Sequence, residues 1–296
     1  MSELEKALTT STGSALIPTQ IDKEINDLVV KETPLISVLK EIPWSTLVYR
    51  WNERTARASA GAYDESDVVG SSSSTPAQRT ITLKMIKSDV LVSNLEIAAT
   101  QDYINSFQSE IESASVSMAH ELERLYIEGN ATANAKEFDG LSSLVTLTYD
   151  AACAAISLDI LDGAINAVQL NGGKPNLIVL ANRDLQQLHK VMRVAMVYNW
   201  EKLEVAAGVY LTNYRGIPLI GSSFISTTLG VSGTESYGFV LDTTQIKIPT
   251  LLPITFEDLS AKTTLDAKVG RIKTYRAMAV KGYNTFHCKI NAIARP

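Results

Sequence analysis

The spacing of apolar positions changes several times along this chain, and each change marks a different kind of element. Apolar and polar side chains alternate over residues 46–57 and again over 80–92, which is typical of β-strands with one apolar face. A change of phase at Met85-Ile86 indicates a bulge or a sharp twist. The stretch between the strands is rich in glycine and serine and cannot bury itself. The pattern predicts a long two-stranded ribbon over residues 44–93.

The predicted ribbon has an apolar, partly aromatic face that needs a surface to lie on, because a two-stranded sheet is marginal alone in water. This face packs either on the ribbon's own domain or on a neighbouring subunit. We expect the second arrangement, with the tip at Ser71–Ser74 ordered only in the assembly. The residues that we expect to line the contact are Leu47, Tyr49, Trp51, Ile81, Leu83 and Met85.

Residues 100–128 carry apolar side chains at intervals of three and four, which predicts one long helix with an apolar stripe. Thr100 can cap its start, and Gly129-Asn130 ends it. At the helical rise per residue such a helix would be roughly 40 Å long, which exceeds the usual globular length. We interpret it as a structural spine.

Beyond the spine, helical patterns alternate with short apolar strands, which predicts a compact α/β lobe over residues 150–244. Strand patterns return at 246–249 and over 269–290. The first 43 residues differ from both, because their short stretch of helical spacing, from Ile21 to Val29, is interrupted at Thr33-Pro34. We interpret residues 1–43 as an arm whose contacts with a neighbour are made by Leu16, Ile17, Ile21 and Ile25. The predicted fold class is α+β.

Charge changes this picture only slightly. The net charge of −5 argues against a protein whose main task is to coat nucleic acid. The C-terminal residues are nevertheless basic, with Asp266 as the only acid after residue 260. These basic side chains either pair with acidic surfaces or form a strip that faces nucleic acid, and we favour the first alternative. They are Lys262, Lys268, Arg271, Lys273, Arg276, Lys281, Lys289 and Arg295.

The remaining composition fits a protein made in a reducing compartment. The two cysteines, Cys153 and Cys288, are far apart in sequence and form no disulfide framework, so we expect both to be small buried hydrophobes. The N-terminus lacks the apolar core of a secretory signal, and no run approaches the ~18 apolar residues that span a bilayer.

The sequence contains no motif that indicates an enzyme or a metal centre. His120-Glu121 begins like a zinc-protease motif, but Arg124 stands where the second histidine belongs, so we expect His120 to face solvent. Nucleophile elbows, Walker A loops and dinucleotide fingerprints do not occur. We therefore expect no catalytic residue, no metal and no cofactor.

The order of arm, ribbon, spine helix, α/β lobe and returning strands resembles the major capsid proteins of tailed phages, which have the Hong Kong 97-type shell fold. Four local stretches are also similar to that family. They are the arm from Leu16-Ile-Pro18 to Leu39, the segment from Glu128-Gly-Asn130 to Glu137-Phe-Asp-Gly-Leu141, the strand and helix start at Leu177–Leu185, and Gly216–Gly221.

The resemblance implies an N-arm at 1–43, an E-loop at 44–93, a P-domain with the spine helix at 94–149, an A-domain at 150–244 and P-domain return strands at 245–296. Such subunits form hexamers and pentamers that close into an icosahedral shell around packaged double-stranded DNA, inside a bacterial or archaeal host. The arm begins directly after Met1, so we expect a separate scaffold protein or none. A portal and decoration proteins are further expected partners, DNA is held by non-specific proximity, and no membrane is involved.

Some members of that family cross-link an E-loop lysine to an asparagine on a neighbour. The candidates here are Lys84 and Lys87 on the ribbon, with Asn284 or Asn291 in the returning strands. Both lysines lie on the return strand rather than at the tip, so we favour ordinary solvated lysines.

Two other functions remain open at this point. An encapsulin has the same fold and encloses a cargo enzyme instead of DNA, but this N-terminus lacks a helical start of the encapsulin kind. An α/β enzyme with an inserted hairpin is disfavoured by the missing catalytic constellation.

Overall fold

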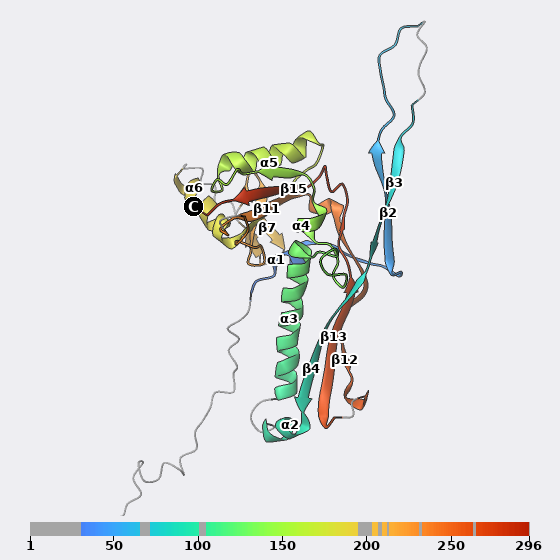
Figure 1. Ribbon diagram of the computed structural model, residues 1–296, viewed down its shortest axis with the longest axis vertical. Helices are drawn as coiled ribbons and strands as arrows, with labels where there is room; N and C mark the ends of the chain where they lie inside the picture. The colour runs from blue at the N-terminus through green and yellow to red at the C-terminus, as the bar shows by residue number, and fades with distance from the viewer. Residues whose placement is uncertain are drawn as a thin grey trace, which may run out of the picture.

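The computed structural model describes residues 31–65, 72–100, 105–194, 203–206, 209–211, 213–230, 233–262 and 265–295. Figure 1 shows three parts: a compact lobe, a spine helix that descends from the lobe beside a long sheet, and a thin hairpin that projects past the lobe. Helices and strands are segregated around the spine and mixed in the lobe, as the predicted α+β class requires.

The spine is helix α3 (Ser106–Glu128), about 35 Å long at the helical rise per residue. It begins later than predicted because α2 (Asn94–Thr100) is a separate short helix. The cap is therefore Asn105, whose side chain accepts a hydrogen bond from the amide of Gln108, and not Thr100. The predicted end at Gly129 is confirmed.

The long sheet runs along the spine in the strand order β1-β12-β13-β4. Its members are β1 (Glu41–Pro43), β12 (Ile246–Asp258), β13 (Ala267–Arg276) and β4 (Lys84–Ser93), and β14 (Ala279–Val280) pairs with the start of β12. One face of β4 and β13 packs on the apolar stripe of α3. That core contains Val90, Val92, Ala114, Met118, Leu122 and Ile272.

The projecting hairpin consists of β2 (Val48–Ala56) and β3 (Thr75–Thr82), paired only with each other. The predicted ribbon was too long: residues 84–93 belong to β4 and pair with β13 in the long sheet. The predicted phase change also lies slightly too late, because the break between the two strands falls at Leu83. The hairpin is thus an extension of the long sheet.

The lobe is built on a six-stranded sheet in the order β5-β15-β11-β6-β10-β9. Its strands are β5 (Thr148–Asp150), β15 (Cys288–Ile293), β11 (Ser236–Leu241), β6 (Leu177–Ala181), β10 (Ile217–Ser222) and β9 (Asn213–Tyr214). Helices α5 (Leu158–Leu170) and α6 (Asn182–Val194) pack on it, and β7 (Leu203–Ala206) pairs with β8 (Val209–Leu211). The lobe strands and helices predicted from the sequence are confirmed.

One lobe boundary differs from the prediction. Strand β15, expected among the P-domain return strands, lies between β11 and β5 in the lobe sheet. The reason is apolar burial: Cys288, Ile290 and Ile293 are fully buried in the lobe core. Residues 148–150 also belong to this sheet, so the lobe begins slightly before residue 150.

The remaining short elements connect these parts. They are α1 (Pro34–Val38), α4 (Leu141–Leu144) and the 3-10 turns at Thr243–Gln245 and Ser260–Lys262. Of the two cysteines, Cys288 is buried as expected, but Cys153 is exposed in a left-handed turn and lies 3.6 Å from a carboxylate oxygen of Glu235. Within the described ranges, no helix is long and apolar enough to cross a membrane.

Candidate assembly surfaces

The base of the hairpin packs on its own subunit. Tyr49 is buried in the main core, and Trp51 and Ile81 pack against that core. The ring centroids of Tyr49 and Trp51 are 5.6 Å apart, and Trp44 meets Tyr49 edge-on at 4.8 Å. The apolar face that the sequence analysis assigned to a neighbour is therefore covered within the chain.

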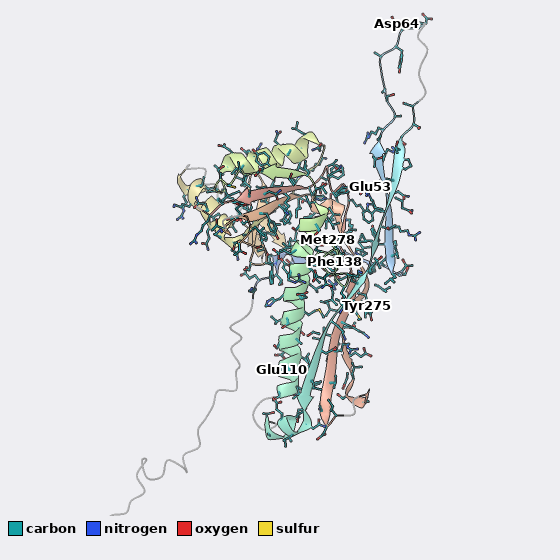
Figure 2. All side chains as sticks on the ribbon, viewed as in Figure 1. Glu53, Asp64, Glu110, Phe138, Tyr275 and Met278 are labelled. Atoms are coloured by element: carbon teal, nitrogen blue, oxygen red, sulfur yellow. The ribbon has the colours of Figure 1, made fainter. Side chains whose placement is uncertain are left out.

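A polar clamp holds the hairpin stem above this apolar base. Glu53 accepts hydrogen bonds from the indole N–H of Trp51 at 2.7 Å and from the amide of Gly282 at 3.0 Å. Arg79, on the opposite strand, donates to the hydroxyl of Tyr283 at 2.6 Å and stacks over its ring. Figure 2 labels Glu53 where the stem passes the lobe and Asp64 at the far tip. The clamp sets the direction in which the hairpin leaves the body.

The opposite face of the hairpin is exposed and polar. In the antiparallel register Arg50 lies opposite Thr80, and Asn52 lies opposite Gln78. Arg54 continues this face toward the tip. All five side chains are exposed, and in the described part of the chain neither arginine forms an ion pair. Alternation puts these side chains on the face opposite the buried Tyr49 and the partly buried Trp51.

The six predicted ribbon contacts thus divide into two groups. Tyr49 and Leu83 are buried in their own subunit, and Trp51 and Ile81 are partly buried there, so the prediction of one shared intersubunit face is wrong. Leu47 and Met85 keep more than half of their surface exposed, at 57% and 51%. Met85 lies on β4, away from the hairpin. The alternation in the sequence correctly predicts which side chains of a strand share a face. It does not show whether that face is covered by the same subunit or by a neighbour.

The predicted arm contacts Leu16, Ile17, Ile21 and Ile25 lie outside the described residues. The described part of the arm, from Lys31 to Pro43, is docked on the body. Leu35 and Leu39 are buried in the main core, and β1 pairs in parallel with β12. His120 is half-buried beside Lys31 rather than facing solvent, with Nε2 3.0 Å from the Lys31 amide nitrogen.

The cross-link candidates lie in different parts of the subunit. Lys84 donates to the carbonyl oxygen of Ala135 at 2.8 Å, and Lys87 pairs with Asp89 at 3.3 Å. Asn284 is exposed in the turn that carries Tyr283, and Asn291 lies in the lobe sheet opposite Asp150. The fold does not bring a lysine and an asparagine of this set together within one chain.

Many of the C-terminal basic residues have partners within the chain. Arg271 pairs with Asp89 at 2.6 Å, and Lys273 pairs with Glu257. Arg276 is buried, with its guanidinium 2.6 Å from Glu41 and 3.0 Å from the hydroxyl of Tyr126. The ammonium group of Lys289 lies over the ring of Tyr237. Internal pairing accounts for these residues better than a strip that faces nucleic acid.

Two surface features were not found from the sequence. Strand β12 exposes apolar side chains beside the spine helix: Leu251 at 39%, Ile254 at 48% and Phe256 at 47%. Exposed leucines also gather at the end of the long sheet away from the lobe, on β4, α2 and the loop before β13: Leu91, Leu95 and Leu265. No His, Cys, Asp and Glu cluster that could hold a metal ion occurs among the residues that the structure describes.

Comparison with known proteins agrees with this architecture. The cyanophage A-1(L) capsid protein superposes with a TM-score of 0.74 at 14% identity, covering 97% of this chain and 99% of that one. The capsid of an empty GTA particle gives a TM-score of 0.75 at 12% identity, covering 98% and 100%. The SrpI encapsulin of Synechococcus elongatus PCC 7942 gives 0.73 at 14% identity, covering 97% and 96%. At these identities the likeness establishes the Hong Kong 97-type fold.

The sequence itself gives the family. No curated protein sequence matches this chain. The family model described as SU10 major capsid protein matches residues 6–294, which is nearly the whole chain. The chain therefore belongs to the SU10 major capsid protein family, the structural proteins of a phage head.

Proposed function

We propose that this capsid protein assembles into hexamers and pentamers that close into an icosahedral shell around double-stranded DNA. The observation that carries the proposal is the hairpin β2–β3, which projects from the body with both edges unpaired and one face polar and exposed. A two-stranded hairpin of this kind is marginal on its own, and a neighbouring subunit supplies the missing surface. Repeated around a symmetry axis, such contacts produce closed rings.

The contact that the hairpin makes differs from the one expected from the sequence. Its apolar base is used within the subunit, so the neighbour meets the polar face with Arg50, Asn52 and Arg54. Leu47, at the start of the hairpin, and Met85, on β4, remain available for apolar contacts. The arm residues Leu16, Ile17, Ile21 and Ile25 are proposed as a second contact with a neighbour.

A lysine–asparagine cross-link receives little support. Lys84 is already hydrogen-bonded to a backbone carbonyl, and Lys87 to a carboxylate. Denaturing gels of mature particles test the idea directly, because cross-linked shells would give ladders and uncross-linked shells a single monomer band. We expect a single band at the mass of the monomer.

Electron microscopy of the purified full-length protein tests the shell itself. We expect closed particles with fivefold vertices, formed alone or after addition of a separate scaffold protein. A deletion of residues 54–78 that keeps the base of the hairpin should leave folded subunits that form no particles. Folded wild-type subunits that stay monomeric at high concentration, with and without a scaffold protein, would contradict the proposal.

The SrpI encapsulin supports a second candidate function, because its fold matches this chain as well as the phage capsids do. An encapsulin-type shell would enclose a cargo protein. The contents of particles purified from the native host decide between the two: nuclease-resistant double-stranded DNA supports the phage head, and a co-purifying enzyme without DNA supports the encapsulin.

A further inference from the structure

A carboxylate of the spine helix makes hydrogen bonds that join the helix to the arm. Helix α1 begins after Thr33, but the side chain of Thr33 makes no capping hydrogen bond. The amides of Leu35 and Ile36 donate instead to the two carboxylate oxygens of Glu123, at 3.0 and 3.2 Å. These are amides that an N-cap side chain normally satisfies. Glu123 thus supplies the cap from a different helix, 88 positions away from Leu35.

The surroundings of Glu123 make these two hydrogen bonds important. Its side chain is fully buried, and among the described residues it forms no ion pair. Burial raises the pKa of Glu123 to about 7, although the two arm amides act in the opposite direction. Without the arm, this carboxyl group would have no hydrogen-bond partner in the described structure, which is costly for a buried polar group.

A second side chain one turn earlier on the spine helix contacts the same segment. Nε2 of His120 lies 3.0 Å from the amide nitrogen and 3.1 Å from the carbonyl oxygen of Lys31. The ammonium group of Lys31 lies 5.3 Å from the ring centroid of Phe224, which also stacks near His120. The polar contacts of α3 with the arm therefore extend from Lys31 to Ile36.

We propose that His120 and Glu123 form a docking site for the arm, which fixes the position of residues 31–36 on the spine helix. The site recognises backbone atoms of residues 31–36 rather than their side chains. Its role deepens the proposed shell function and rests on it, since the reach of the arm toward a second copy of the chain is then set by α3. Glu123 and His120 are positioning residues in this scheme.

Limited trypsin digestion of full-length subunits tests the docking site. Cleavage after Lys31 and Lys40 requires the local segment to open, and under mild conditions its rate follows the population of the open form. Glu123→Gln keeps the side-chain volume but removes one acceptor oxygen, and we expect cleavage at both lysines to rise roughly tenfold. The matched control is Glu112→Gln on the exposed face of the same helix, which should digest like wild type.

A second variant separates docking on α3 from simple capping of α1. Thr33→Asp places a carboxylate at the N-cap of α1, where it can accept from the same amides. Added to Glu123→Gln, it caps α1 without restoring a contact with α3, so cleavage should stay fast. His120→Ala, at a half-buried position beside Lys31, should speed cleavage at Lys31 more than at Lys40.

Three outcomes would overturn the inference: Glu123→Gln digesting like Glu112→Gln, slow cleavage restored by Thr33→Asp alone, or unchanged cleavage in His120→Ala. Microscopy of the same variants keeps this result separate from the shell proposal. If wild-type protein forms shells and Glu123→Gln leaves cleavage unchanged, the docking site fails and the shell function stands. If wild-type protein forms no shell while the cleavage pattern is as expected, only the shell function fails.

Discussion

Glu53, on the outgoing strand of the hairpin, accepts a hydrogen bond from the amide of Gly282, although 229 positions separate the two residues. The same carboxylate also holds the indole of Trp51 and lies 3.6 Å from Arg79. One side chain therefore joins both hairpin strands to the turn that follows the long sheet. Its position explains why the hairpin has a defined direction even though it pairs with no other strand.

We predict that Glu53→Ala loosens the stem without unfolding the subunit. The indole N–H of Trp51 and the amide of Gly282 would each lose their acceptor, which typically costs ~1–3 kcal/mol per buried group. Hydrogen exchange should become faster in β2 and β3 and stay unchanged in β6 and β11. Glu65→Ala, at the exposed tip, is the matched control and should leave exchange in the stem as in wild type. Equal exchange in the two variants would contradict the clamp.

We predict that Arg276→Met strongly destabilises the subunit. The Arg276 side chain is 1% exposed and bonds Glu41, Tyr126 and Thr274. The variant leaves the buried hydroxyl of Tyr126 without its charged donor, which typically costs ~1–3 kcal/mol, whereas the Glu41 side chain is 42% exposed and stays partly solvated. Thermal unfolding should show a clearly lower midpoint. Arg215→Met, which breaks the exposed ion pair with Asp162, should change the midpoint little. A midpoint for Arg276→Met within a degree of wild type would show that the network is not stabilising.

We predict acid sensitivity from His287. Its Nδ1 accepts from the amide of Asp242, Nε2 lies 3.1 Å from the carbonyl oxygen of Lys281, and the side chain is buried, so burial lowers its pKa to about 4. A histidine with a lowered folded pKa stabilises fully above its ordinary value near 6.5 and loses that contribution as the pH falls toward 4, roughly 3 kcal/mol in all. Melting curves from pH 7.5 to 4.5 should fall more steeply for wild type than for His287→Asn. Parallel curves would refute this source of acid sensitivity.

We predict that Gly140→Ala prevents normal folding. A Cβ at Gly140 would lie 2.4 Å from the carbonyl oxygen of Leu125 and 2.8 Å from the amide nitrogen of Gly129, and these backbone atoms end the spine helix. Backbone cannot move aside as a flexible side chain can, so we expect a loss of about 3 kcal/mol or more. Yield and melting temperature measure the effect. Gly61→Ala, where no atom comes closer than 3.4 Å, should behave like wild type.

Local patterns were reliable where one chain segment determines its own structure. The apolar spacing of α3 and α5, and the glycine at the end of α3, were visible in the sequence because the helical period and the C-cap are local properties. The resemblance to phage capsid proteins used the order of such elements. One of the stretches similar to that family runs from Glu128 to Leu141. Its two glycines, Gly129 and Gly140, have a structural reason, because their backbones are in direct contact.

The surfaces could not be predicted in the same way. Alternation shows that Tyr49 and Trp51 share a face, but what covers that face depends on a core built from segments hundreds of residues apart. The place of β15 in the lobe and the cap that Glu123 gives to α1 are equally non-local. The exposure of Cys153 depends on a left-handed turn at Ala152-Cys153 that nothing in its neighbours' composition demands. Long-range packing decides each of these points.

A single residue, Leu83, separates the hairpin from the long sheet, and it is buried with its amide bonded to the carbonyl oxygen of Leu47. The hairpin is therefore joined to the long sheet by one buried residue and not by a flexible linker. A mechanical force on its tip would act on the core without a flexible segment in between. Such a force would be transmitted to β4 and distributed over the hydrogen bonds that pair β4 with β13. Strain at one tip thus reaches the spine helix of the same subunit directly.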